Sequence, residues 1–197
     1  MRLRPITRAD RGTWQRVRRA NVDWLSRWDA TPPGRKAGRA VPPPRSYGAM
    51  VKIMLREAGA GRQLPFVVEY DGQFVGQVTI SNLVRGSAQF ASIGYWIDER
   101  YAGRGITTRA VALAVDHSFG PVGLHRIEIA IRPENSSSLR VVEKLGITQI
   151  GFAPNYLHID GDWRDHAIFA ITREEVPGGI VRRLNLPPAA PDSHQSQ

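Results

Sequence analysis

The chain has 197 residues, enough for one compact domain with a buried core. Hydrophobic residues make up 42% and charged residues 23%, which are ordinary values for a soluble globular protein. The absence of cysteine excludes disulfides, thiolate metal sites and a cysteine nucleophile, and we expect no metal site. The 27 Lys and Arg residues against 18 Asp and Glu residues give a formal net charge of +9. Such a charge favours anionic partners, such as nucleic acid or a phosphate-rich cofactor.

The first 58 residues predict a short strand and two helices separated by a loop. Residues 2–7 alternate polar and apolar side chains and predict a strand. Apolar residues recur at helical spacing in residues 8–28 and again in residues 46–58. Residues 30–45 contain prolines and glycines that deny them helix or central-strand structure, so we expect a mobile loop. Its basic side chains are Arg35, Lys36, Arg39 and Arg45.

The rest of the chain alternates strands with helices. A hydrophobic period of two predicts three strands joined by hairpin turns, at residues 64–70, 74–83 and 90–97. There follow a helix, a strand, a second helix that ends at Gly146, and a last hairpin, at residues 107–119, 126–131, 135–145, 147–159 and 163–172. This order predicts a single α+β domain with a mixed, mostly antiparallel twisted sheet flanked by helices.

The two ends of the chain set the expected domain limits. Residues 1–6 lack the apolar run and cleavage site of a signal peptide, and no stretch approaches the ~18 apolar residues of a membrane span. We therefore expect a cytoplasmic protein with no membrane contact. Beyond Val176 the chain becomes rich in Pro and Gly. We place one domain at residues 1–176 and a tail at residues 177–197, whose distal part we expect to be disordered.

The loop between the strand at residues 90–97 and the next helix is the most informative stretch. Gly103 and Gly105 permit a tight loop whose backbone N–H groups converge, and the helix adds its positive N-terminal end. Arg100 and Arg104 add full charges. Together these features suit a pyrophosphate, and an ordinary tight turn is the alternative. The glycine spacing of a dinucleotide-binding fold is absent, and so is the Gly-Lys-Ser/Thr of a P-loop.

The motif Arg100-x-x-Gly103-x-Gly105 resembles the coenzyme A loop of the GNAT acetyltransferases. A second motif of that family follows at the proper distance, Asn135-x-x-Ser138 and the run that ends at Gly146, although Ile147 replaces the usual Phe. The resemblance covers residues 3–172. It implies a sheet that splays between its fourth and fifth strands, with acetyl-coenzyme A bound as co-substrate in the gap.

The resemblance also implies which residues contact acetyl-coenzyme A. They lie on the fourth strand, in the loop that follows it and in the second motif: Tyr95, Trp96, Ile97, Arg100, Tyr101, Ala102, Gly103, Arg104, Gly105, Ile106, Thr107, Asn135 and Ser138. In the family the Ser138 hydroxyl would lie near the cofactor sulfur and protonate the leaving thiolate. A helix cap is the alternative role for Asn135, and a solvent-facing serine is the alternative for Ser138.

Three further segments resemble the ribosomal-protein-alanine N-acetyltransferases of the RimJ type: residues 21–28, 81–86 and 156–166. They lie outside the coenzyme A motifs, so they concern the acceptor. The implied acceptor is a protein N-terminal α-amine, such as the alanine of a ribosomal protein. The candidate acceptor contacts are Asn21, Trp24, Trp28, Asn82 and Tyr156. Local turn or helix chemistry is the alternative for the asparagines, and core packing is the alternative for the aromatic residues.

Direct attack by the amine fits a chain without a cysteine nucleophile. An α-amino group titrates near 7.7–8.0, so a weak base or a water relay suffices to deprotonate it. Tyr156 is a candidate wall or proton relay of the acceptor site. Glu128, on the strand at residues 126–131, is the best-placed carboxylate for a water-mediated base. An ion pair with Arg126 or Arg132 is the alternative for Glu128.

Two other functions remain open at this point. One is acetylation of a small amine, such as an amino sugar, a polyamine or an antibiotic. The other is a non-catalytic GNAT-fold protein that binds RNA or the ribosome through the basic loop at residues 30–45. The sequence has no aromatic RNA-binding strand motif, and an intact phosphate loop favours the enzyme.

Overall fold

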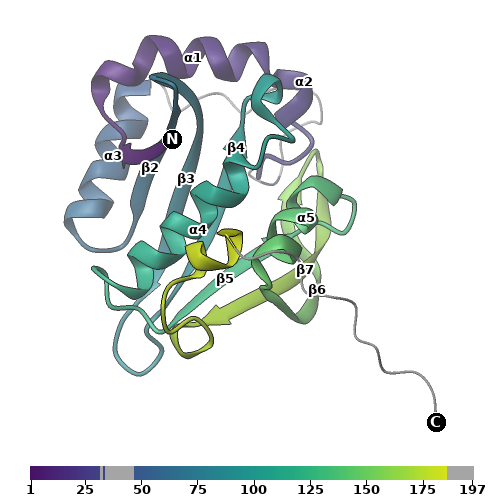
Figure 1. The fold of residues 1–197 in the computed structure, drawn as a ribbon. Helices are drawn as coiled ribbons and strands as arrows, with labels where there is room; N and C mark the ends of the chain where they lie inside the picture. The colour runs from purple at the N-terminus through teal and green to yellow at the C-terminus, as the bar shows by residue number, and fades with distance from the viewer. Residues whose placement is uncertain (32, 34–46, 186–197) are drawn as a thin grey trace.

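The computed structural model describes residues 1–31, 33 and 47–185. These residues form one seven-stranded sheet with helices on both faces (Figure 1). The strands are β1 (Arg2–Pro5), β2 (Leu64–Tyr70), β3 (Gln73–Val84), β4 (Phe90–Ile97), β5 (Arg126–Ile131), β6 (Thr148–Ile159) and β7 (Asp162–Thr172). Their order across the sheet is β1-β2-β3-β4-β5-β7-β6, and among the described strands only β4 and β5 pair in parallel. The predicted α+β fold is therefore confirmed.

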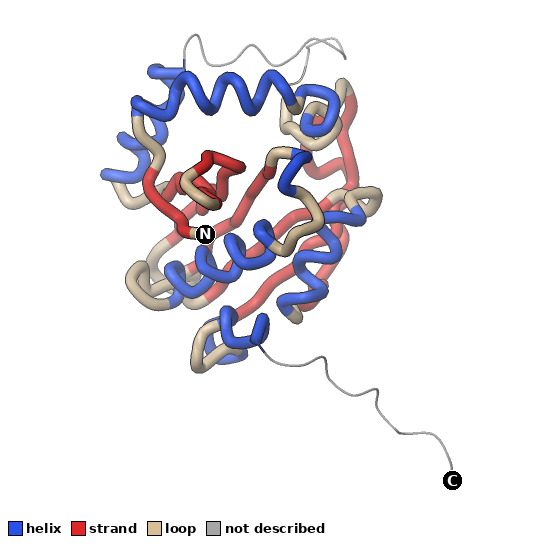
Figure 2. Tube along the Cα trace, turned by 45° about the horizontal axis from the view of Figure 1, so that its top comes forward, coloured by secondary structure: helices blue, strands red, loops and turns tan. Residues whose placement is uncertain are grey.

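Two groups of helices cover the two faces of the sheet (Figure 2). One face carries α1 (Arg11–Ala20), α2 (Val22–Leu25) and α3 (Tyr47–Gly59), and the other carries α4 (Ile106–Phe119) and α5 (Ser136–Leu145). Short 3₁₀ helices are η1 (Arg8–Asp10), η2 (Glu99–Tyr101), η3 (Arg173–Glu175) and η4 (Ile180–Asn185). The helix predicted over residues 8–28 is thus three pieces, because Asn21 leaves the helical conformation (φ −116°, ψ 23°) between α1 and α2.

Alternation along the strands divides the core into two parts. Ile93 of β4 packs in the larger cluster under α4 and α5, together with Ile129 of β5. Trp96 of β4 points to the opposite face and packs against the smaller cluster under α1 and α3. This is the two-residue period that predicted these strands. β3 approaches β4 so closely at Gly76 that a Cβ there would lie 2.4 Å from the carbonyl oxygen of Trp96.

The β4–β5 pair is short. Residues 90–92 of β4 pair with residues 126–128 of β5, and beyond Ser92 the two strands diverge. Among the described strands none pairs with the β5-facing edge of residues 93–97. The splay between the fourth and fifth strands is therefore confirmed. The Ile97 carbonyl oxygen on this edge accepts a hydrogen bond from Trp24 Nε1. The other backbone groups of this edge have no strand partner, and such groups need hydrogen-bond partners when water is excluded.

The core continues past residue 176, where the sequence predicted the tail to begin. Ile180 of η4 is fully buried in the main cluster. Asp116 of α4 accepts hydrogen bonds from the backbone N–H groups of Ile180 (2.6 Å) and Val181 (3.2 Å). Arg183 donates from Nη1 to the carbonyl oxygen of Leu145 at the end of α5 (2.6 Å). The predicted domain boundary at residue 176 is therefore too early. Residues 180–183 pack against the domain although the sequence beyond Val176 is rich in Pro and Gly.

Two other expectations from the sequence concern the basic loop with the C-terminal tail, and the absence of a membrane-spanning segment. Residues 34–45, which carry the basic side chains of the predicted loop, and residues 186–197 of the predicted tail lie outside the described residues. Within residues 1–31, 33 and 47–185, no helix is both long enough and apolar enough to span a membrane.

We expect Asp116→Ala to destabilise the domain by about 1–3 kcal/mol, because it leaves backbone N–H groups of a buried segment without their acceptor. Urea unfolding monitored by tryptophan fluorescence measures this change. Glu143→Ala, which removes an exposed carboxylate from α5, is the control. Equal unfolding midpoints for the two variants would show that Asp116 does not hold the C-terminal segment.

Candidate active site

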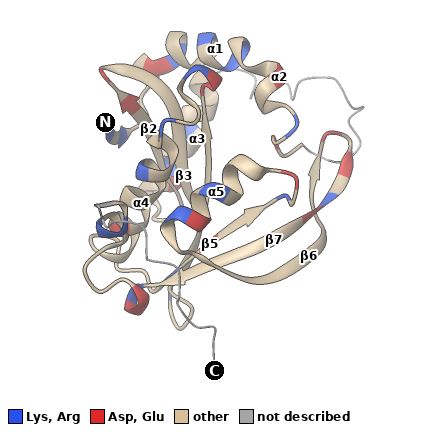
Figure 3. Ribbon diagram, turned by 45° about the vertical axis from the view of Figure 1, so that its right-hand side comes forward, with Lys and Arg blue, Asp and Glu red and all other residues tan. Residues whose placement is uncertain are grey.

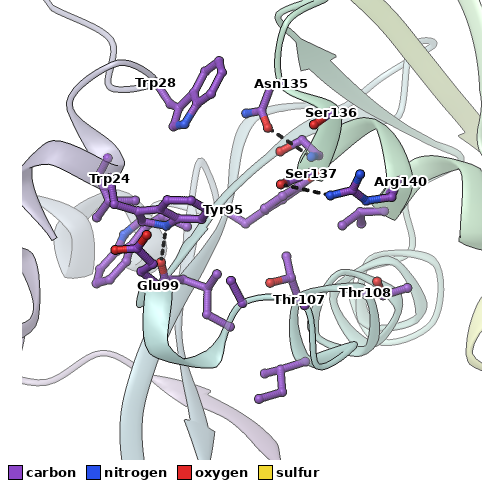
Figure 4. A pocket seen from close by; sticks show the side chains of 18 of the residues that line it. Trp24, Trp28, Tyr95, Glu99, Thr107, Thr108, Asn135, Ser136, Ser137 and Arg140 are labelled. Atoms are coloured by element: carbon purple, nitrogen blue, oxygen red, sulfur yellow. Dashed lines mark hydrogen bonds between the residues drawn. The ribbon is translucent and has the colours of Figure 1, made fainter.

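A cavity of about 690 Å³ opens where β4 and β5 diverge. Its walls come from α2 and the residues that follow it, from β4 and η2, from the first turn of α4 and from one face of α5 (Figure 4). A smaller cavity of about 160 Å³ lies between the end of β4, β5 and the β6–β7 hairpin. Both cavities share five lining residues: Trp28, Gly94, Tyr95, Asn135 and Ser138. The two cavities therefore meet at the splay.

The predicted phosphate loop forms the floor of the larger cavity at the start of α4. Gly103 (φ 74°) and Gly105 (φ 75°) both have left-handed backbone, and Gly105 is the N-cap of α4. A side chain at this φ is strained, so the glycines are required by backbone conformation. Thr107 and Thr108 of the first helical turn also line the cavity. The positive end of α4 thus faces the space where an anion would bind.

The two arginines of the loop lie differently from the sequence expectation. Arg100 turns back onto Asp98, with a 2.6 Å ion pair from Nη2 to a carboxylate that is fully buried. Burial opposes ionisation of Asp98, but hydrogen bonds from the Arg100 side chain and backbone hold its pKa below the usual range. Arg104 packs over the Tyr101 ring at 5.4 Å. Neither arginine lines the cavity. Arg100 therefore shapes the loop and does not offer a free charge.

The cations that line the larger cavity are Arg27, which follows α2, and Arg140 and Lys144 on α5. Arg140 and Lys144 are exposed and lie one turn apart on the face that carries Ser137 and Val141. Sequence reasoning missed both. The signal was available, since Ser137, Arg140, Val141 and Lys144 follow the helical i, i+3, i+4, i+7 spacing after the Asn135 motif.

Asn135 and Ser138 lie together at the start of α5. Asn135 is the N-cap, and its Oδ1 accepts a hydrogen bond from the backbone N–H of Ser138 (3.1 Å). The helix-cap alternative is therefore correct for Asn135, and its side chain still lines both cavities. The cap fixes the first turn of α5, which in turn places Ser138 at the junction of the cavities.

Tyr95, one of the predicted coenzyme A contacts, brings a hydroxyl to the site. This hydroxyl reaches the junction near Ser138. In the described part of the chain it is the one fully buried polar side-chain atom without a hydrogen-bond partner. Burial raises the pKa of Tyr95 to about 12, and the neighbouring Ser138 side chain opposes that shift. The phenol therefore stays protonated and can donate a hydrogen bond to a bound molecule.

Trp24 and Trp28 form the opposite wall (Figure 4). The Trp24 indole Nε1 donates to the carbonyl oxygen of Ile97 (3.1 Å), which ties α2 to the end of β4. Trp28 lies under the Arg132 guanidinium at 5.3 Å and borders both cavities. Trp24 thus lines only the larger cavity and Trp28 lines both, and their role as acceptor contacts stays a prediction.

Asn21, Asn82 and Glu128 also lie outside both cavities. Asn21 is buried and donates from Nδ2 to the carbonyl oxygen of Val17 (2.8 Å). Its Oδ1 accepts a hydrogen bond from the backbone N–H of Glu99 (2.8 Å), so the amide links α1 to η2. Asn82 is exposed, with left-handed backbone (φ 54°) at an irregularity of β3, which is the turn-chemistry alternative. Glu128 forms a 2.8 Å ion pair with Arg126, its other predicted role. Each of the three side chains thus makes the contact given as its alternative, and their roles in acceptor binding and catalysis stay predictions.

Tyr156 is exposed at 47% and lines neither cavity. Its ring meets His166 edge to face, with 5.4 Å between centroids. His166 is 3% exposed and lines the smaller cavity. Sequence reasoning quoted His166 only within a motif and assigned it no role. Tyr156 therefore contacts a residue of the smaller cavity, His166, without lining that cavity itself.

Comparison with known proteins identifies the family. A family model described as acetyltransferase (GNAT) domain matches residues 1–148, and the chain belongs to the GNAT acetyltransferase family. In structure it is similar to Mycobacterium smegmatis RimJ in complex with CoA-disulfide. The TM-score is 0.86 at 40% identity, covering 93% of this chain and 87% of that one.

Two proteins of Escherichia coli represent the curated relatives. The chain is 35% identical over 107 residues to [Ribosomal protein uS5]-alanine N-acetyltransferase, which covers 54% of this chain and 55% of that protein. It is 33% identical over 102 residues to spermidine N(1)-acetyltransferase, which covers 51% of this chain and 53% of that protein. The chain thus spans about half the length of the curated relatives it matches.

We expect Gly103→Val to weaken coenzyme A binding roughly 5- to 30-fold, since a left-handed residue costs about 1–2 kcal/mol and the loop can escape that strain by moving. Isothermal titration calorimetry measures the affinity. Gly86→Val is the matched control, because Gly86 has φ 68° and equally open surroundings but lines neither cavity. Equal affinity of both variants for coenzyme A would count against the phosphate-loop assignment.

Proposed function

We propose that the chain transfers the acetyl group of acetyl-coenzyme A to the N-terminal α-amine of a protein, by direct attack. The observation that carries the proposal is the meeting of the two cavities at Ser138 and Tyr95. One cavity has the features of a donor site and the other has the size of a small acceptor group. The likeness to ribosomal-protein-alanine acetyltransferases supports a ribosomal protein as the acceptor.

The residues of the larger cavity fit acetyl-coenzyme A. The glycine loop and the start of α4 offer backbone N–H groups to a pyrophosphate. Arg140 and Lys144 add two positive charges to the same cavity. The unpaired edge of residues 93–97 can bind the pantetheine amides as a neighbouring strand would. The buried Tyr95 hydroxyl would gain the partner that it lacks.

Ser138 would assist departure of the thiolate. Its hydroxyl is at the junction of donor and acceptor cavities, and its backbone is fixed by the Asn135 cap. Acetyl-coenzyme A supplies an activated acyl group, so the chain needs only to orient the amine, accept its proton and protonate the leaving sulfur. The buried Tyr95 phenol beside Ser138 would help to keep a proton available on the donor side.

The charges around the cavities favour a protein N-terminus over a polyamine. The smaller cavity is lined by Arg132 and His166 and by no carboxylate. In the larger cavity, Asp29 pairs with Arg18 and Glu134 pairs with Arg132, which leaves Glu99 alone to attract a cation. A polyamine carries several positive charges and would need several free carboxylates. Spermidine remains the second candidate because of the E. coli relative that acts on it.

The acceptor class is tested by mass spectrometry with acetyl-coenzyme A and three kinds of acceptor. These are peptides that begin with Ala, Ser or Thr, peptides with a blocked N-terminus and a free lysine, and spermidine. We expect acetylation of the α-amine in the first set. Faster acetylation of spermidine would replace the proposed acceptor, and no acetylation of any amine would contradict the enzymatic proposal.

We expect Ser138→Ala to lower kcat ~10²-fold while the affinity for coenzyme A stays within about twofold, as for a group that acts mainly in the transition state. Steady-state kinetics and calorimetry provide the two measurements. Ser137→Ala is the matched control, since Ser137 lies one residue away and lines only the larger cavity. An unchanged kcat for Ser138→Ala would remove Ser138 from the mechanism.

A further inference from the structure

We propose that His166 is the general base that accepts the proton of the attacking amine, an inference that rests on the proposed function. Neither the coenzyme A motifs nor the candidate residues of the sequence include it. The inference follows from where the imidazole lies, which of its nitrogens is free and which charges surround it.

His166 lies on the acceptor side of the splay. Ala167 and Phe169 of β7 pack in the cluster under α4 and α5, so alternation turns His166 to the opposite face. There it lines the smaller cavity with Trp28 and Ala130. This cavity shares Tyr95 and Ser138 with the donor cavity. His166 and Ser138 therefore border the same space from the two sides where an acceptor and a donor would approach.

The hydrogen bonding of His166 fixes its tautomer. Nδ1 lies 3.0 Å from the carbonyl oxygen of Arg164, and a carbonyl can only accept, so Nδ1 carries the proton. The lone pair of the neutral ring is then on Nε2. In the described residues Nε2 has no hydrogen-bond partner. Unlike the Tyr95 hydroxyl oxygen, Nε2 is not fully buried. The free nitrogen therefore opens to the cavity.

The surroundings keep the ring neutral. Burial, the largest effect, lowers the pKa of His166, and Arg132 acts in the same direction. The hydrogen bond to Arg164 and the charges of Glu134 and Asp165 oppose the shift, but the net direction is downward. An ordinary histidine titrates near 6.5, so His166 is unprotonated at neutral pH and ready to accept a proton.

The proton transfers then balance across the gap. The nitrogen lone pair of the amine forms the C–N bond, and the electron pair of the C–S bond leaves on sulfur. One amine proton passes to His166 Nε2, and the Ser138 hydroxyl gives a proton to the thiolate. Solvent later removes the proton from His166 and restores that of Ser138. The other candidate bases are occupied or unsuited: Glu128 is paired with Arg126, and Tyr95 stays protonated.

The experiment compares His166→Asn with His158→Asn in the full chain. Asn keeps a side-chain N–H that can reach the Arg164 carbonyl but removes the basic nitrogen. His158 is a matched control: it is buried on the same hairpin, its Nδ1 contacts the Thr31 carbonyl oxygen (3.0 Å), and it lines neither cavity. We expect kcat to fall ~10²–10⁴-fold for His166→Asn alone, with unchanged coenzyme A affinity.

The pH profile separates a base from a merely structural residue. Both the free amine and His166 must be deprotonated, so log kcat/KM of the native chain rises with slope two below the lowered pKa of His166. Between that pKa and the amine pKa it rises with slope one. His166→Asn should keep slope one throughout the acid limb. A native rate, or an unchanged slope of two, in this variant would overturn the proposal.

A second measurement needs no turnover and therefore separates this inference from the proposed function. Nitrogen-15 NMR of the histidine rings, in the chain saturated with coenzyme A, reports tautomer and protonation directly. We expect a neutral ring protonated at Nδ1 for His166 at pH 7. An imidazolium, or a proton on Nε2, would overturn the base assignment even if peptides are acetylated. The expected tautomer without any acetylated acceptor would count against the proposed function alone.

Discussion

The divergence of β4 from β5 is the constraint on which the site depends. Two parallel strands normally continue their ladder, and ending it after three residue pairs leaves polar backbone along the edge of β4. The same separation lets α5 bring Ser138 to the sheet from one side and Trp28 and His166 approach from the other. A substrate that enters the gap would complete the interrupted ladder, so the fold and its recognition of a ligand use the same hydrogen-bonding groups.

Much of this arrangement could be predicted from the sequence because it depends on local patterns. The two-residue period fixed β2, β4 and β5 to the residue, and the turn signals gave the antiparallel hairpins. Gly103 and Gly105 signalled a left-handed loop, which their φ values show. Asn135 is both a residue type that caps helices and part of a family motif. The cap was predictable because it is a local hydrogen bond, from the Ser138 backbone N–H to the Asn135 side chain.

The errors arose where a polar side chain had more than one role open to it. Nothing in the spacing of Arg100 showed that it would pair with Asp98, two residues away, and not line the cavity. Asn21 and Glu128 have polar side chains among apolar neighbours in the sequence. Residues that bind a ligand show this pattern, and so do residues that form hydrogen bonds or ion pairs within the protein. The role proposed for His166 depends on tertiary contacts, since His166 lines the smaller cavity with Trp28 and Ser138 from distant parts of the chain. In Figure 3 the charged residues of the β6–β7 hairpin lie near its tip.

The docked C-terminal segment also has a mechanical consequence. Asp116 anchors it at the far end of α4, and Arg183 bonds the last carbonyl of α5. Both helices line the larger cavity, α4 with its first turn and α5 along one face. Residues 180–183 thus connect α4 to α5 and hold the two helices together in the absence of a ligand. Groups that are already ordered before a ligand binds lose less free energy on binding, so contacts far from an opening can bear on affinity at the opening itself.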